Sequence, residues 1–459
     1  MLLQFESCLE RINIFLKFIG LSIDSDDSNK TTLQRLRKYY IFSIHMFSFN
    51  LSVIGQIVWL IQGLVIGATL WKITYLLPCL TLCVLGDFKV YYFIHHMHHV
   101  NELVKVLRNL LSKRIDNDEE IAEQTKIWLT FLSSISKLLL SLTILGILAF
   151  ALGPFLLIGS NYSRTGEIEL VLPFIVWYPF DELNIRIWPF IYLDQLWSAW
   201  VAVFSVYGPD CFFLTCCTFI HIQFLVLQHD MERIVKEDAW NRPEMTLDTL
   251  KVELVQLVNK HRELIHCINL LEIVYSKSTL FNVMTSSLII CAAGFNLMAI
   301  KNLALMAPFT AFLIFGLLQI FFYCYYSDYV MRSVSEHNLF WGIICSSFNG
   351  NVLFLFQSMG VGDAVYKSRW YEAGTAERKY LLIVLLRSQK PCRLTAYGFT
   401  DINLTAFTRL AINVKIQSVY SFAIYYFVIM SSPYCLSGQR PPSIPSILSH
   451  FLAIPKESI

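Results

Sequence analysis

"RSQKPCRLTAYGFTDI", residues 387–402, is a polar stretch that separates two different parts of a largely apolar chain. Before it, residues 363–389 are amphipathic and carry too many charges to cross a membrane, whereas residues 399–428 after it are apolar. Pro391 should end the first helix, because proline lacks an amide donor and disfavours helix in the residue before it. Gly398 should add flexibility just before the second helix begins. The stretch is therefore predicted to be a hinge between a helix below the membrane and a final helix crossing it.

The composition indicates a membrane protein. Hydrophobic residues make up 55% of the chain and charged residues only 15%, where soluble domains carry about a quarter charged residues. The net charge of +2 and the lack of a basic cluster exclude nucleic acid as a partner. The lipid bilayer is the expected surrounding of the chain.

Seven segments are long and apolar enough to cross a membrane, which takes roughly 20 residues for about 30 Å of hydrocarbon. They are residues 39–62, 70–94, 127–159, 191–228, 278–305, 307–330 and 399–428. We therefore expect an all-α, seven-transmembrane fold, with residues 1–459 forming a single integral membrane domain.

The distribution of Lys and Arg predicts the orientation, because these residues collect in cytoplasmic loops. They are frequent in residues 95–126 and 229–277 and scarce in 160–190, which carries interfacial aromatics such as Trp177. We expect a cytoplasmic N-terminus and an extracellular C-terminus, the reverse of a G-protein-coupled receptor. Apolar residues at helical spacing in 246–277 further predict helices bundled beneath the membrane.

Few residues suggest chemistry. His95 and His99 lie one helical turn apart in "HHMHH", but two ligands make a poor metal site, and interfacial packing is favoured. Asp210 lies midway along the fourth span, where an ionisable residue is either functional or a buried, hydrogen-bonded group. No nucleophile elbow, zinc-protease motif or phosphate loop occurs in the sequence. We expect no enzyme activity, no metal and no cofactor.

Three motifs resemble one family. The run "GDAVYKSRWYEAGTAERKYLLIVLLRSQKPCRLTAYGFTDINLTAFT", residues 362–408, resembles the C-terminal signature of insect odorant receptors. "YCYYSDYVMRSVSE", residues 323–336, is similar to the end of that family's sixth helix. "PDCFFLTCCTFIHIQFLVLQHDMERI", residues 209–234, is similar to its fourth helix. The similarity is greater to moth receptors, with the pheromone branch as one assignment.

The resemblance implies a ligand-tuning subunit of an odorant-gated cation channel in the plasma membrane of olfactory sensory neurons. Such a subunit forms a heterotetramer with a shared olfactory co-receptor and recognises a small, volatile, hydrophobic ligand. Residues 363–389 would be the cytoplasmic anchor helix. Residues 399–428 would be the pore-lining helix, to which Phe407, Leu410 and Val414 belong.

The resemblance also implies functional residues. Those expected to gate or couple are Asp210, Pro391 and Gly398. The ligand pocket of the family lies in the outer half of the subunit, and an apolar ligand needs an apolar, aromatic cavity with few polar groups. The candidate ligand-binding residues are Tyr75, Cys79, Phe150, Pro154, Trp200, Phe204, Phe309, Phe312 and Gln319, with core packing as the alternative for each.

Two segments depart from the family pattern. Residues 337–356, "HNLFWGIICSSFNGNVLFLF", stand where the family runs almost directly from the sixth helix into the anchor helix. A pyrimidine-rich splice acceptor that ends in CAG would encode "LFLFQ", residues 353–357, if it were translated, so we hypothesise that part of an intron has been read through. Beyond Arg409 the final helix also departs from the family, and residues 430–459 form an atypical Pro/Ser-rich tail.

Two other functional classes remain possible from the sequence. A gustatory-type channel receptor of the same fold would have a more polar pocket. A secondary transporter would show inverted repeats and a broken helix in both halves of the chain, whereas only one break is visible.

Overall fold

The computed structural model describes residues 1–23, 32–66, 70–112, 119–235, 247–299, 303–331, 360–367, 375–388 and 393–409. Within these ranges the regular structure is helical, apart from one isolated β-bridge between Thr395 and Asp401. The helices are α1 (Leu2–Phe18), α2 (Thr32–Ile66), α3 (Leu70–His95), α4 (Met97–Ser112), α5 (Glu119–Thr165), α6 (Trp188–Val235), α8 (Leu247–Ala299), α9 (Leu303–Met331), α11 (Gly360–Lys367) and α12 (Thr375–Ser388).

Six of these helices, α2, α3, α5, α6, α8 and α9, are long and apolar enough to cross a membrane. Five of the predicted spans fall within α2, α3, α5, α6 and α9, and the span predicted at 278–305 lies in α8, which ends earlier, at Ala299. Of the seventh predicted span, 399–428, the structure describes residues 399–409, where a short helix runs from 404 to 409. The atypical segments 337–356 and 430–459 lie outside the described residues.

α8 differs from the prediction of two separate helices at 246–277 and 278–305. It is one helix of 53 residues, Leu247–Ala299. Its sequence holds no proline, and its single glycine is Gly294, so nothing interrupts the backbone hydrogen bonds at the predicted boundary. At 1.5 Å per residue it is about 80 Å long, far more than a bilayer requires.

The helix α1 was not predicted from the sequence. Apolar residues Phe5, Leu9, Ile12 and Leu16 repeat at helical spacing and are buried, and the helix packs against α6 and α4. Phe5 lies edge-on to Phe219 of α6, with ring centroids 4.9 Å apart.

α4 corrects the prediction that residues 95–126 form a loop. α3 ends at His95 and α4 begins at Met97, so "HHMHH" marks the bend between two helices. The Nδ1 atom of His96 lies 3.0 Å from the carbonyl oxygen of Tyr92 in the preceding turn. The apolar face of α4 packs against α8, and the bidentate pair between Arg108 and Glu6 joins α4 to α1.

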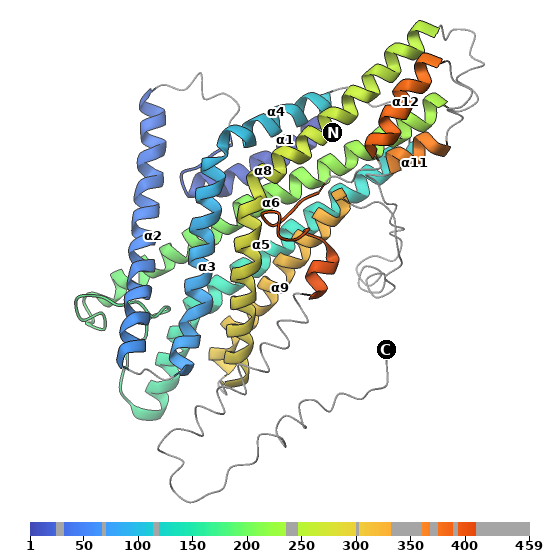
Figure 1. The fold of residues 1–459 in the computed structure, drawn as a ribbon. Coiled ribbons are helices and arrows are strands. Elements are labelled where there is room, and N and C mark those ends of the chain that lie inside the picture. The colour runs from blue at the N-terminus through green and yellow to red at the C-terminus, as the bar shows by residue number, and fades with distance from the viewer. Residues whose placement is uncertain are drawn as a thin grey trace, which may run out of the picture.

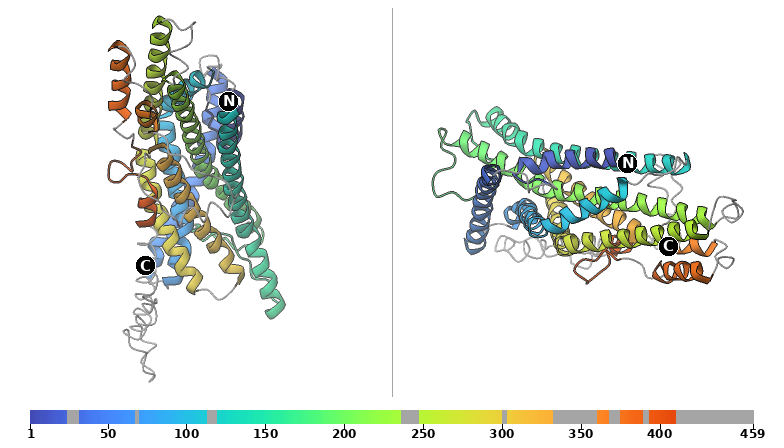
Figure 2. Two further views of the ribbon diagram at one scale, coloured as in Figure 1. Left: turned by 90° about the vertical axis from the view of Figure 1, so that its right-hand side faces the viewer. Right: turned by 90° about the horizontal axis from the view of Figure 1, so that it is seen from above.

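The helices run roughly alongside one another, and the two ends of the bundle differ (Figure 1). α1, α4, α11 and α12 gather toward one end, here called the bundle end. The connection between α5 and α6, residues 166–187, lies toward the other end, here called the loop end. α2 stands at one side of the other helices in Figure 1 and in the view from above (Figure 2, right), and it contacts α3 and α6.

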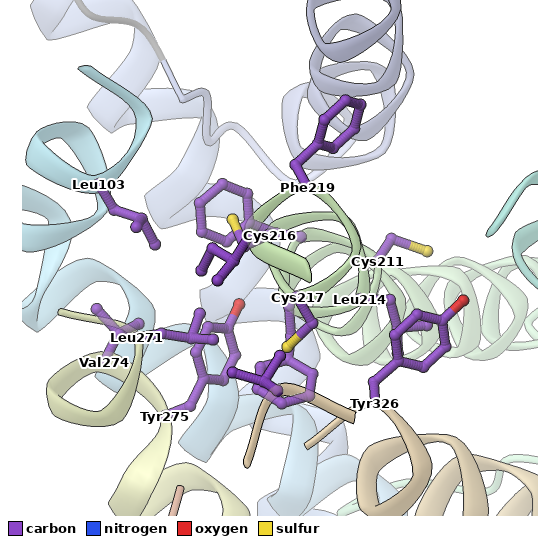
Figure 3. Packing of buried hydrophobic residues seen from close by; sticks show 14 of the residues in the cluster. Leu103, Cys211, Leu214, Cys216, Cys217, Phe219, Leu271, Val274, Tyr275 and Tyr326 are labelled. Atoms are coloured by element: carbon purple, nitrogen blue, oxygen red, sulfur yellow. The ribbon is translucent and has the colours of Figure 1, made fainter. Parts of the chain in front are cut away.

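α6 is the centre of the core. Residues 204–227 of this helix are buried throughout. Side chains of α4, α8 and α9 surround it, including Leu103, Tyr275 and Tyr326 (Figure 3).

The predicted anchor helix 363–389 is described as two helices, α11 and α12, with the prediction's residues 368–374 outside the described ranges. α11 begins at Gly360, three residues earlier than predicted. α11 packs on α6 and α12 on α8, and the two helices pack against each other. A Cβ atom at Gly362 would lie 2.4 Å from Oγ and 3.3 Å from Cβ of Ser388, so α11 and α12 approach each other closely here.

Candidate functional site

A cavity with a volume of about 90 Å³ lies toward the loop end of the bundle. α2, α3, α5, α6, α9 and the α5–α6 connection all contribute to its wall. The residues that line it are Phe49, Ser52, Gln56, Cys79, Leu82, Cys83, Leu142, Thr143, Gly146, Ile147, Phe150, Phe174, Val176, Gln195, Ser198, Ala199, Ala202, Val203, Val206, Pro308, Ala311, Phe312 and Phe315. Of these described residues none carries a charge, which suits a neutral and largely apolar ligand.

The α5–α6 connection forms one wall of this cavity because Gln195 of α6 holds it in place. The Gln195 side chain accepts a hydrogen bond from the backbone N–H of Phe174 and donates one to the carbonyl of the same residue, at 3.0 and 3.2 Å. Its amide also lies 3.2 Å from the hydroxyl of Tyr178. Burial raises the pKa of Tyr178, so this hydroxyl stays neutral.

Gly55 of α2 lets the connection approach closely. The backbone N–H of Trp177 donates a hydrogen bond of 3.1 Å to the Gly55 carbonyl oxygen. A Cβ atom at Gly55 would lie 2.5 Å from Cγ1 of Val176 and 2.9 Å from the carbonyl oxygen of Trp177. Residues 174–177 are thus packed between α2 and α6 as a lid on the cavity.

The structure brings three of the predicted ligand-binding residues into the cavity wall: Cys79, Phe150 and Phe312. Tyr75 and Phe309 are not among the lining residues and instead pair edge-on with each other, with ring centroids 5.0 Å apart.

Four predicted residues lie elsewhere. Pro154 is buried within α5 but does not line the cavity. Trp200 contacts Phe204, and Phe204 packs against Phe18 of α1 with ring centroids 4.9 Å apart. Gln319 is bonded to Asp210, one helical turn beyond the cavity.

The prediction missed the contribution of α2 and of the α5–α6 connection. Ser52 and Gln56 are polar residues four positions apart in an apolar span, and both are buried. Polar residues in membrane helices face protein rather than lipid. The spacing of Ser52 and Gln56 could therefore have predicted which face of α2 points into the protein. Phe174 and Val176 carried no comparable signal, because the wall position of this loop depends on its contacts with Gln195 and Gly55.

Asp210 is the centre of a buried polar cluster next to the cavity. Its carboxylate accepts hydrogen bonds from Nζ of Lys89 at 2.5 Å, from the hydroxyl of Tyr323 at 2.6 Å and from Nε2 of Gln319 at 2.6 Å. The Lys89 and Asp210 side chains are only 1% and 6% exposed. The cluster therefore joins α3, α6 and α9 through a fully desolvated charge pair with its hydrogen bonds supplied.

The cluster continues to α8. The hydroxyl of Tyr275 donates a hydrogen bond of 2.6 Å to the carbonyl oxygen of Pro209. Phe213 lies between the aromatic rings of Tyr275 and Tyr323, with centroids 4.9 and 4.6 Å away.

Residues 393–402, the described end of the stretch quoted first, form a turn that is hydrogen-bonded to α8. Glu272 of α8 accepts hydrogen bonds from both the backbone N–H and the side-chain hydroxyl of Thr395. Ser276 accepts one from the backbone N–H of Tyr397 at 2.9 Å. Tyr397 and Gly398 have positive φ angles of 53° and 74°, a conformation for which glycine is suited. Gly398 thus shapes a tight turn.

The last described helix follows this turn. Asn403 caps it by accepting a hydrogen bond from the backbone N–H of Ala406 at 2.8 Å. Phe407 packs against Phe321 of α9, with ring centroids 5.5 Å apart. Pro391, Leu410 and Val414, also predicted as coupling or pore residues, lie outside the described residues.

Comparison with protein families supports the resemblance seen in the sequence. Residues 72–336 and 343–414 match the family described as 7tm Odorant receptor. The match is interrupted at residues 337–342, at the start of the atypical segment 337–356, and resumes within it.

Individual proteins are similar over most of their length. The chain is 22% identical to putative odorant receptor 92a of Drosophila melanogaster, over 92% of this chain and 93% of the relative. It is 23% identical to odorant receptor 67c of the same species, over 92% and 94%. The fold resembles that of the olfactory receptor OR5 from Machilis hrabei in complex with eugenol, with a TM-score of 0.72 at 16% identity, over 92% of this chain and 99% of that one.

Proposed function

This chain belongs to the 7tm odorant receptor family, and from that premise we propose that it is the ligand-recognising subunit of an odorant-gated cation channel. The observation that carries this proposal is the uncharged, mostly apolar cavity beneath residues 174–177. Such a cavity suits a small, volatile, hydrophobic molecule, because an apolar ligand gains free energy by leaving water and needs few polar contacts.

The proposed topology has seven spans, a cytoplasmic N-terminus and an extracellular C-terminus, with the loop end outside. The scarcity of Lys and Arg in residues 160–190 and their abundance in 95–126 and 229–277 support this orientation. The last described helix, 404–409, would be the start of the seventh span, which lines the pore.

We propose that ligand binding reaches this last helix through the Asp210 cluster. Val206 and Phe315 line the cavity, and each lies four residues, about one turn, before a member of the cluster on the same helix: Asp210 on α6 and Gln319 on α9. Displacing either helix at the cavity would act on the cluster. Tyr275 then connects the cluster to the part of α8 that holds the turn at 393–403.

Assembly with a co-receptor into a heterotetramer is proposed to use the bundle end. Leu382, Ile383 and Leu386 of α12 are 40%, 56% and 63% exposed. This apolar face lies at the end where the cytoplasmic anchor is expected, and a neighbouring subunit would cover it. Olfactory sensory neurons are the proposed site of expression, and a moth-type receptor of the pheromone branch is the proposed subfamily.

We propose that residues 337–356 include translated intron. The interruption of the family match at 337–342 supports this for the start of the segment. Sequencing of spliced messenger RNA from antennae tests it, and transcripts that retain the segment would refute it.

The function is tested by whole-cell recording from cells that express this chain with an insect olfactory co-receptor, during application of volatile compounds. Cells with the co-receptor alone are the control, and a form lacking residues 337–356 is tested in parallel. Currents that require this chain and depend on the compound support the proposal. Silence of both forms despite labelling at the cell surface contradicts it.

A further inference from the structure

Two polar atoms in the cavity wall have no hydrogen-bond partner. They are Oε1 of Gln56 on α2 and Oγ1 of Thr143 on α5. The two residues are only 4% and 7% exposed, and both line the cavity. Buried polar atoms without a partner are uncommon, because each loses its hydration without compensation.

Three other uncharged polar residues of the wall, Ser52, Ser198 and Gln195, have hydrogen-bond partners. The hydroxyls of Ser52 and Ser198 lie 3.2 Å apart and bond to each other. Gln195 is occupied with the backbone of Phe174. Gln56 also interacts with the Cys83 thiol, but its Oε1 and the Thr143 Oγ1 are left for an occupant of the cavity.

The chemistry of these two groups selects among possible ligands. The Gln56 carbonyl oxygen can only accept a hydrogen bond, whereas the Thr143 hydroxyl can donate or accept. A hydrocarbon satisfies neither atom, and an aldehyde or ester accepts from Thr143 but gives Gln56 nothing. A carboxylic acid or an amine would need a counter-charge, and none of the described wall residues supplies one. An alcohol meets both groups.

We propose that the cavity is selective for small apolar alcohols, whose hydroxyl group donates a hydrogen bond to Oε1 of Gln56, with Thr143 as a second polar contact. This inference rests on the proposed function, since it names the ligand class of the same cavity. A site built to bond a hydroxyl rejects analogues that lack it, because its buried polar atom is then left unpaired.

The test uses the full chain with the co-receptor and two sets of compounds matched in carbon skeleton. The first set is 1-octanol, octanal, octanoic acid and octane, and the second is 2-phenylethanol, phenylacetaldehyde and ethylbenzene. The expected result is that the alcohol of at least one set acts at a concentration about tenfold lower than its aldehyde or hydrocarbon, as one buried hydrogen bond allows.

The variant Gln56→Leu has nearly the same volume without the acceptor. It should lose about tenfold in sensitivity to the alcohol while its response to the matched hydrocarbon is kept or improved. Gln62→Leu is the matched control, because Gln62 lies on the same helix and is exposed. If Gln56→Leu does not reach the cell surface, Gln56→Asn, which withdraws the carbonyl group by one methylene, should narrow the preference for the alcohol.

Different results would contradict the alcohol selectivity and the proposed function. Equal sensitivity to alcohol, aldehyde and hydrocarbon, or an unchanged ranking in Gln56→Leu, would mean that water satisfies these atoms, and would overturn the inference while odorant gating stands. Silence toward every compound despite surface labelling would overturn the proposed function, and the inference with it.

Discussion

Tyr275 of α8 donates a hydrogen bond of 2.6 Å to the carbonyl oxygen of Pro209 on α6, and both residues are buried. Asp210 follows Pro209 in the chain, and Ser276, which bonds the backbone of Tyr397, follows Tyr275. One contact between two helices therefore connects the buried charge pair with the turn that precedes the last helix.

Tyr275→Phe removes this hydrogen bond and keeps the ring that packs against Phe213. A hydrogen bond contributes about 1 kcal/mol, so we expect a shift of about fivefold in the ligand concentration for half-maximal current. Tyr91→Phe, at an exposed position of α3, is the control. If both variants behave alike, Tyr275 has no part in coupling.

The charge pair of Lys89 and Asp210 gives a prediction about stability. Asp210→Asn leaves the Lys89 ammonium buried without its counter-charge, which should lower the free energy of unfolding by about 3 to 5 kcal/mol. Lys89→Met combined with Asp210→Asn removes both charges and should restore much of that loss. The check is thermal denaturation of the detergent-solubilised protein, followed by size-exclusion chromatography. A double variant less stable than either single variant would contradict it.

The bonds from Thr395 to Glu272 give a prediction about gating. In Glu272→Gln the acceptor is no longer charged and one of its oxygens is replaced by a donor, so the turn is held less firmly, by about 1 to 3 kcal/mol. Maximal current should fall at least fivefold at equal surface expression. Glu253→Gln, on an exposed face of the same helix, is expected to behave as the unmodified chain. Equal maximal currents of both variants would show that the turn does not need this carboxylate.

The helices were predictable because length and apolar composition determine which segments can cross a bilayer. The hydrogen-bonded turn at residues 393–403 could not be predicted, because its partners Glu272 and Ser276 lie about 120 positions earlier in the chain. Proline and glycine predicted a break in the helix, but whether a break is loose or bonded depends on what packs against it. The continuity of α8 was misjudged at Lys277, where a charge was taken as a membrane boundary although no residue there breaks a helix.

The cavity was less predictable than the helices. Aromatic residues occur on every face of these spans, and the choice of the inward face depends on the neighbouring helices. Phe204 packs against Phe18 of α1, an element that was not expected, and Trp200 packs against Phe204. Polar residues would have been the better guide. Gln56, which was not predicted, lies in the cavity wall, and Asp210 forms a buried pair with Lys89.

Gln195 gives a prediction about the lid. Gln195→Leu removes the hydrogen bonds to Phe174 and should let residues 174–177 leave the cavity. A cysteine at Val176, which is 7% exposed, should then react about tenfold faster with a membrane-impermeant maleimide added outside intact cells. Ile185→Cys is the control, because Ile185 is 75% exposed and should react equally with either residue at 195. Failure of Ile185→Cys to react from outside would overturn the proposed orientation, and an unchanged rate at Val176→Cys would show that Gln195 does not hold the lid.

Gly55 tests the same lid from α2. Gly55→Ala places a Cβ atom 2.5 Å from Cγ1 of Val176 and 2.9 Å from the carbonyl oxygen of Trp177, and such overpacking costs about 1 to 3 kcal/mol. We expect a loss of about tenfold in ligand sensitivity, measured as the ligand concentration for half-maximal current, because the displaced lid no longer completes the cavity wall.

Val176→Ala in the same chain removes the closer atom and should recover part of the sensitivity, while the contact with the backbone oxygen remains. Gly153→Ala is the control, since a Cβ atom there meets nothing within 4 Å. A normal response from Gly55→Ala would mean that the lid tolerates displacement and that the ligand does not depend on it.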